Sequence, residues 1–210
     1  CGMGLWGFAQ NPVRENLPVQ RKRMVLRRRY GLFYLLTFLA GARRQIFIAF
    51  AVFLMVKRFG FTVQEITLLF VVNNGVNYYL SPLVGKAIVR FGERRVLSLE
   101  YGSMVLIFLA YALVQAKWIV AVLYILDHIF FNFAIAIRTY FQKVADPRDI
   151  APSMAVGFTI NHVAAVVLPA LGGMLWLIDY RYVFFSGALL SFMSLLLVWL
   201  IPAQLRRQQQ

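Results

Sequence analysis

The chain alternates long apolar stretches with short polar junctions over most of its length. A helix needs about 20 mostly apolar residues to cross about 30 Å of hydrocarbon. From residue 31 onward this pattern predicts six spans: residues 31–56, 63–84, 96–115, 118–136, 154–178 and 182–201. The connections between them are short and leave no room for a soluble domain. The pattern predicts an all-α membrane protein built as an up-and-down bundle of six transmembrane helices.

Turn and capping residues mark several of the junctions. Phe59-Gly60-Phe61 ends the first apolar stretch, and Thr62 to Glu65 has the spacing of a capping box before the second. Asp146-Pro147-Arg148-Asp149 separates the fourth stretch from the fifth. We therefore expect helices to end and begin at these positions.

Composition supports a membrane protein and argues against a nucleic-acid binder. Hydrophobic residues make up 61% of the chain, against roughly 45–50% in ordinary soluble domains. The formal net charge is +14, but the basic residues lie mostly between apolar blocks and not on one soluble face. Cys1 is the only cysteine, so no internal disulfide can form. Because the first residue is not methionine, we expect the chain to be part of a longer protein.

The distribution of Lys and Arg predicts the orientation, because basic residues are retained on the cytoplasmic side. The N-terminal segment, the second and fourth connections and the tail carry 16 basic residues, and the other connections carry four. We thus expect a basic cytoplasmic linker at 1–29, a transmembrane domain at 30–202 and a cytoplasmic tail at 203–210, in a plasma membrane such as the bacterial inner membrane. The run RKRMVLRRR at 21–29 fits this topology and attraction to anionic lipid; a specific nucleic-acid or headgroup site is the less favoured alternative.

Polar residues at mid-depth occur in some spans and not in others. The third span has only Glu100, near its cytoplasmic start, and the sixth has no charged residue between Phe184 and Ile201. The other four carry Arg43 and Arg44 in the first, Asn73, Asn74 and Asn77 in the second, Asp127 and His128 in the fourth, and Asn161 and His162 in the fifth. We predict that these four helices line a polar path, while the third and sixth face lipid.

Each of these groups also has a purely structural interpretation. An arginine at the centre of a span costs about 2.5–3.5 kcal/mol on insertion scales, so it normally faces the bundle interior or water. Arg43 or Arg44 can pair with Asp127 to fix helix packing, or can face a ligand. The two interpretations are compatible if the ion pair breaks during a transport cycle. Membrane asparagines often join helices by hydrogen bonds. His128 suits a proton relay, but a packing role is equally open.

The connection between the second and third spans carries a recognisable motif. It reads Gly85-Lys86-Ala87-Ile88-Val89-Arg90-Phe91-Gly92-Glu93-Arg94-Arg95-Val96-Leu97. This resembles the signature loop of the major facilitator superfamily, with matches at Gly85, Arg90, Gly92, Arg94 and Leu97. Val89 replaces the usual aspartate, and Glu93 a basic residue. We expect the glycines to permit tight helix ends, and Arg90, Arg94 and Arg95 to hold neighbouring helix ends at the cytoplasmic surface.

The resemblance implies a fold and a mechanism. It implies a six-helix half of a transporter, the C-terminal one, whose first and fourth helices line a central cavity and whose third and sixth face lipid. One of Arg43 and Arg44 then faces the cavity, since adjacent helical residues point about 100° apart. The expected substrate is a small organic anion, or the arginine modulates a proton-coupled carboxylate, with Asp127 as its leading partner. The expected partners are a small-molecule substrate, a coupling proton or ion, lipid, and a missing N-terminal half or second copy. No cofactor is expected.

Other membrane proteins fit the sequence less well. An ATP-driven permease needs long coupling extensions, and six-helix channels carry Asn-Pro-Ala half-helices; neither is present. An intramembrane enzyme centred on Asp127-His128 and Asn161-His162 is the leading alternative from another class. Neither a Gly-x-Ser-x-Gly nor a His-Glu-x-x-His motif supports it. A free-standing half with a scaffold or signalling role is a further alternative.

Overall fold

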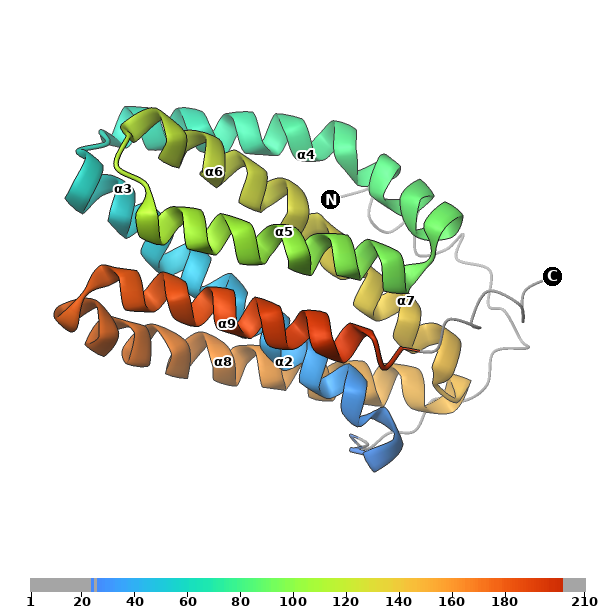
Figure 1. Ribbon diagram of the computed structural model, residues 1–210. Coiled ribbons are helices and arrows are strands. Elements are labelled where there is room, and N and C mark those ends of the chain that lie inside the picture. The colour runs from blue at the N-terminus through green and yellow to red at the C-terminus, as the bar shows by residue number, and fades with distance from the viewer. Residues whose placement is uncertain (1–23, 25, 202–210) are drawn as a thin grey trace, which may run out of the picture.

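The computed structural model describes residues 24 and 26–201, and these residues form helices joined by very short turns. The predicted linker, residues 1–29, lies largely outside the described residues, and the predicted tail, 203–210, lies entirely outside them. Within the described part the chain runs back and forth six times, so that each helical passage is antiparallel to the one before it (Figure 1).

The first passage departs from α geometry near its middle. It begins with the 3₁₀ turn η1 (Arg28–Tyr30), continues as α2 (Gly31–Ile46), passes through a π-helical segment η2 (Phe47–Ala51) and ends as α3 (Val52–Phe59). Gly60 closes α3 in the left-handed region, with φ 61°. A π segment inside a helix shifts the faces on either side relative to each other and is often found at functional sites.

The other passages are long helices whose bounds extend past most of the predicted spans. They are α4 (Val63–Phe91), α5 (Glu93–Leu113), α6 (Lys117–Phe131) with the 3₁₀ turn η3 (Asn132–Ala134) and α7 (Ile135–Val144), then the turn η4 (Pro147–Asp149) with α8 (Ile150–Ile178), and α9 (Tyr180–Val198). The predicted capping box at Thr62 is present: the Glu65 amide donates to its hydroxyl, and the Glu65 carboxylate accepts from its amide.

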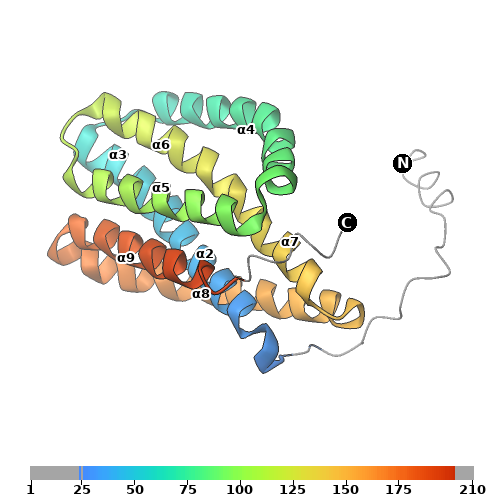
Figure 2. The same cartoon turned by 45° about the vertical axis from the view of Figure 1, so that its right-hand side comes forward.

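Five of these passages are long and apolar enough to cross a membrane, judged on the described residues: Arg28–Phe59, Glu93–Leu113, Lys117–Val144, Pro147–Ile178 and Tyr180–Val198. The passage that misses this standard is α4. It has 29 residues, but it contains Asn73, Asn74 and Asn77, which lower its hydropathy. The count of six membrane-crossing helices therefore stays a prediction, although α4 packs along the bundle like the others (Figures 1 and 2).

Small residues set the closest helix contacts. Gly187 of α9 lies against the ring of Phe108 of α5, and Ser191 and Ser194 continue the buried face of α9. Gly172 of α8 lies against the ring of Phe50. In lipid, small residues let helix backbones approach closely and pack by van der Waals contact. These glycines therefore allow α9 to pack closely against α5, and α8 to pack closely against the first passage.

The buried apolar residues form two clusters stacked along the bundle. One contains Ile46, Met104 and Tyr124, and the other contains Ala40, Leu97 and Ala136. The buried polar residues Arg43, Glu100 and Asp127 lie between these positions along α2, α5 and α6. Asn73 lies similarly between Ile66 and Val84 of α4. A polar layer thus crosses the bundle between two apolar clusters.

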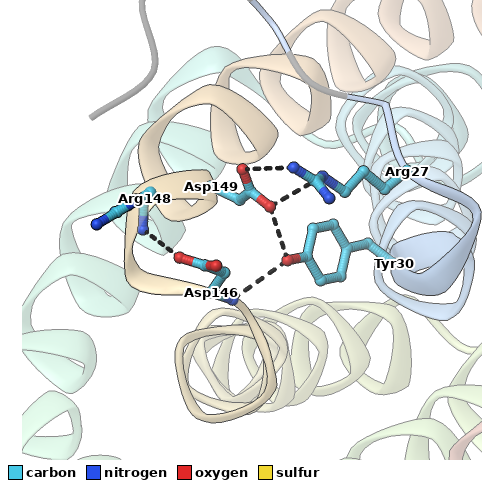
Figure 3. A network of polar contacts seen from close by, with 5 residues as sticks. All are labelled: Arg27, Tyr30, Asp146, Arg148 and Asp149. Atoms are coloured by element: carbon cyan, nitrogen blue, oxygen red, sulfur yellow. Dashed lines mark hydrogen bonds and ion pairs between the residues drawn. The ribbon is translucent and has the colours of Figure 1, made fainter. Parts of the chain in front are cut away.

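A network of polar contacts ties the start of the first passage to the turn between α7 and α8 (Figure 3). The Tyr30 hydroxyl donates to Asp149 at 3.0 Å and accepts from the Asp146 amide at 3.2 Å. Arg27 Nε lies 2.9 Å from the same carboxylate, which is fully buried. The Asp146 carboxylate also accepts from the Arg148 amide and so caps η4. Residues about 120 positions apart are joined at this end of the bundle.

Candidate functional site

The two arginines of the first passage lie in different surroundings. Arg43 is fully buried in the polar layer, whereas Arg44 is exposed. Because consecutive helical residues point about 100° apart, one faces the inside of this bundle and the other faces out of it. The polar groups around them accordingly form two sets, a buried centre around Arg43 and an open face around Arg44.

The buried centre joins α2 to α5. Arg43 Nη2 lies 3.4 Å from Glu100 Oε1, and neither side chain has any exposed surface. The Arg43 guanidinium also lies over the ring of Tyr101, 4.3 Å from its centroid. Asp127 of α6 is fully buried as well and lies within electrostatic range of Arg43 and Glu100, but its two carboxylate oxygens have no hydrogen-bond partner.

This arrangement corrects one expectation about the charged residues, because Asp127 was the expected partner of the arginine. The structure pairs Arg43 with Glu100 instead. The reason is the direction of the side chain: Arg43 Nε donates to the Leu39 carbonyl one turn earlier, so the guanidinium reaches back toward the start of α2. The start of α5, which carries Glu100, lies at the same end of the bundle (Figure 1).

The open face joins α2, α4 and α6. The Arg44 guanidinium lies 6.0 Å from the ring centroid of Phe131, and its charge acts on His128. His128 is half-buried between the rings of Phe47 and Tyr124, and its Nδ1 has no hydrogen-bond partner. Asn132, one turn further along, follows directly after α6. The open face thus presents a cation, an imidazole and amides together.

The predicted asparagines play different roles. The Asn132 side-chain amide donates to the side-chain oxygen of Asn77 and to the backbone carbonyl of His128, which links α4 to α6. Asn73 is buried with neither side-chain polar atom bonded, and it lies in the polar layer. Asn161 Oδ1 lies against Gly41 where α8 meets α2, and it also has no hydrogen-bond partner. Sequence reasoning missed Asn132, although its spacing of four residues from His128 places both on one helix face.

The motif between α4 and α5 forms a junction of a single residue. Gly92 has φ 83° and separates two helices that end at Phe91 and begin at Glu93, as its expected role requires. Gly85 was expected at a helix end, but it lies inside α4 because that helix continues to Phe91.

Two charged residues of the motif, Glu93 and Arg94, contact neighbouring helix ends. The Arg94 guanidinium lies over the ring of Trp199, 4.9 Å from its centroid, just after α9 ends. Glu93, which stands where the motif has a basic residue, forms an ion pair with Lys143 of α7 at 2.7 Å. Arg90 and Arg95 are exposed. The start of α5 is thereby attached to the ends of α7 and α9.

Comparison with known proteins agrees with the motif and with the arrangement of helices. The family model described as Major Facilitator Superfamily matches residues 33–209, which is most of the chain. No curated protein and no solved structure matches the chain. Members of this superfamily are membrane transporters and not enzymes. The chain therefore belongs to the major facilitator superfamily, as a secondary transporter of a solute.

Proposed function

We propose that the chain is the C-terminal half of an alternating-access transporter and that Arg44 binds a small organic anion. The observation that carries this proposal is the exposure of Arg44 near the middle of a long membrane helix. Within the described residues no carboxylate pairs with it. An unpaired arginine facing hydrocarbon is costly, so its surroundings in the complete protein must supply water or an anion.

The chemistry of the open face favours an anion over a cation. A guanidinium binds a carboxylate or phosphate through two parallel hydrogen bonds. The positive charge of Arg44 extends as far as His128, so it would repel a cationic substrate at this face. The amides of Asn77 and Asn132 offer neutral hydrogen-bonding groups beside them. A carboxylate or phosphate monoester of modest size is the substrate class that suits these groups.

The outward faces of α4 and α8 support a partner half. On α4 the exposed residues include Asn74, Tyr78 and Tyr79, and on α8 they include His162. Polar side chains within a membrane usually face protein or water and not lipid. In the proposed transporter a second half, or a second copy of this chain, covers these faces, and the two halves rock about a central site.

The orientation is part of the same proposal. The turns alternate between the two ends of the bundle in Figure 1. One end carries Lys57, Arg58, Lys117 and Arg181, and the other carries the Arg-rich start of the first passage and the motif after α4. Because Lys and Arg are retained inside, we place the second end in the cytoplasm.

The intact mass of the polypeptide in its source membrane tests the half-transporter assignment. A mass roughly double the 24.1 kDa of this chain supports it. A mass equal to that of the chain would instead require two copies to form one transporter. Chemical cross-linking in the same membrane then shows whether a dimer forms, and a monomer alone would contradict the proposal of two rocking halves.

Uptake measurements test the anion site. The full-length protein is reconstituted in proteoliposomes and offered a panel of labelled mono- and dicarboxylates and phosphate monoesters. A hydrogen bond to a charged group contributes about 1.5–3 kcal/mol, so Arg44→Ala should lower uptake of the accepted anion about tenfold to a hundredfold. Arg44→Lys keeps the charge and should retain part of the activity. Arg58→Ala, at the end of the same passage, is the matched control and should have no such effect.

Two results would overturn the anion site. One is unchanged uptake of every accepted anion in a well-inserted Arg44→Ala variant. The other is uptake of neutral or cationic solutes only. Insertion is checked by the yield of monodisperse protein in detergent, so that a loss of uptake is not confused with a loss of fold.

A further inference from the structure

The buried centre holds more acid than base. Arg43, Glu100 and Asp127 are all fully buried, in the polar layer between the two apolar clusters. The Arg43 guanidinium contacts Glu100 at 3.4 Å, which leaves the Asp127 carboxyl group without a hydrogen-bond donor. Arginine stays protonated in proteins, so it supplies one positive charge to two carboxyl groups.

No other described group near the centre balances the second carboxylate. The ionisable groups near Asp127 are Arg43 from α2, Glu100 and Tyr111 from α5, and Tyr124 from its own helix, while Tyr101 of α5 lies against the Arg43 guanidinium. On the flanking face, His128 of α6 and Arg44 of α2 lie further out, with Arg44 exposed and His128 half-buried. From α4 the buried polar side chain is the neutral Asn73, and from α9 the buried polar side chains are Ser191 and Ser194.

An ionised Asp127 would therefore be a buried charge without a partner. The penalty for taking one ion out of water is several kcal/mol even after the protein relaxes, and it is offset only by a close partner and hydrogen bonds. Asp127 has neither a donor at either oxygen nor a cation in contact. Binding one proton removes the charge and this penalty together.

We propose that the Arg43–Glu100–Asp127 centre is a proton-binding site, with the proton held on Asp127 while Arg43 contacts Glu100. If Arg43 turns to Asp127, the Asp127 proton leaves to water and Glu100 takes one proton from water, so the centre again holds one proton and one ion pair. When Arg43 turns back to Glu100, Glu100 releases its proton to water and Asp127 takes one from water, so the centre returns to its starting state with its protons balanced. The centre differs from the open face around Arg44, so it stands or fails independently of the anion proposal.

Infrared spectroscopy tests the site without knowledge of the substrate. The full-length protein in lipid at neutral pH should show the carbonyl stretch of a protonated carboxylic acid, shifted in heavy water. Asp127→Asn should abolish this band. Glu100→Gln should also abolish it, because one carboxylate then remains for one arginine. Glu65→Gln is the control: its carboxylate is 43% exposed and paired with Lys117, so the band should persist.

The outcomes separate the proposal from its rivals. Both variants replace a carboxyl group with an amide of nearly equal size, and circular dichroism and elution volume confirm that they fold. A wild-type protein without the band, or a band that survives Asp127→Asn, overturns the proposal. A band that appears only when sodium is removed also overturns it, because sodium and not a proton then balances Asp127. Survival of the band in Glu100→Gln contradicts the exchange of Arg43 between the carboxyl groups.

Discussion

Arg43 of α2 and Glu100 of α5 form an ion pair of 3.4 Å although neither side chain touches solvent. The pair joins two residues that lie 57 positions apart in the chain, on two different helices. A buried ion pair is held mainly because each charge would be costly alone, and it adds little net stability compared with apolar residues of similar size.

A double-mutant cycle should show this asymmetry. Arg43→Met leaves Glu100 without its cation and should lower stability by about 3–5 kcal/mol. The double variant Arg43→Met/Glu100→Leu removes both charges and should recover most of the loss. Thermal unfolding of detergent-purified protein measures both. Glu100→Leu alone completes the cycle, and a loss in the double variant equal to the sum of the two single losses would show that the pair has no coupling.

The contact between Gly172 and Phe50 predicts a difference between adjacent glycines. A Cβ at position 172 would lie 2.5 Å from a ring carbon of Phe50, whereas a Cβ at 173 meets nothing within 4 Å. Gly172→Ala should therefore lower stability by about 1–3 kcal/mol, the usual cost of overpacking. Gly173→Ala should be neutral or slightly stabilising, since alanine favours helix. Thermal unfolding measures the stability of both glycine variants. Equal effects of the two substitutions would contradict the packing of α8 on the first passage.

The network in Figure 3 predicts the cost of losing one hydroxyl group. Tyr30→Phe removes the donor to the buried Asp149 and the acceptor of the Asp146 amide. Asp149 keeps its ion pair with Arg27, so the loss is that of a hydrogen bond to a charged group, and stability should fall by about 1.5–3 kcal/mol. Tyr78→Phe is the control, because Tyr78 is 77% exposed. A loss no greater than that of the control would mean that this network does not hold the end of the bundle.

Labelling of single cysteines should reveal the orientation. Lys57 and Arg90 are both exposed and lie at opposite ends of the bundle. In a background with Cys1 replaced by serine, Lys57→Cys should react with a membrane-impermeant thiol reagent added outside cells. Arg90→Cys should react only after the membrane is opened. The reverse pattern would contradict the cytoplasmic placement of the motif after α4.

Much of the fold could be predicted from local patterns. The apolar stretches located all six helical passages, and Thr62, Gly60 and Gly92 marked turns that the structure contains. The helix ends were less well predicted: the fourth passage continues to Val144, beyond the expected 136. Hydropathy registers the apolar part of a helix, but hydrogen bonding extends a helix into polar sequence beyond it.

The candidate site could be predicted only in part. The sequence located Arg43, Arg44, Asp127 and His128 as ionisable groups within apolar stretches. The periodicity of the α-helix required the side chains of the two arginines to point in different directions. It did not reveal that Arg43 reaches Glu100, or that Asn132 bonds to Asn77. A long side chain such as that of arginine can reach a group at another depth of the membrane. The position of a residue along its own helix also does not determine how the neighbouring helices tilt or which side chains they bring near.

The sequence by itself determined the membrane class, the positions of the helices and the family motif, because these depend on hydropathy, capping and turn residues close together in the chain. Only the tertiary structure decided which carboxyl group balances Arg43 and which is left without a partner. That choice depends on how α2, α5 and α6 pack, and small residues far apart in sequence set the distances between helices.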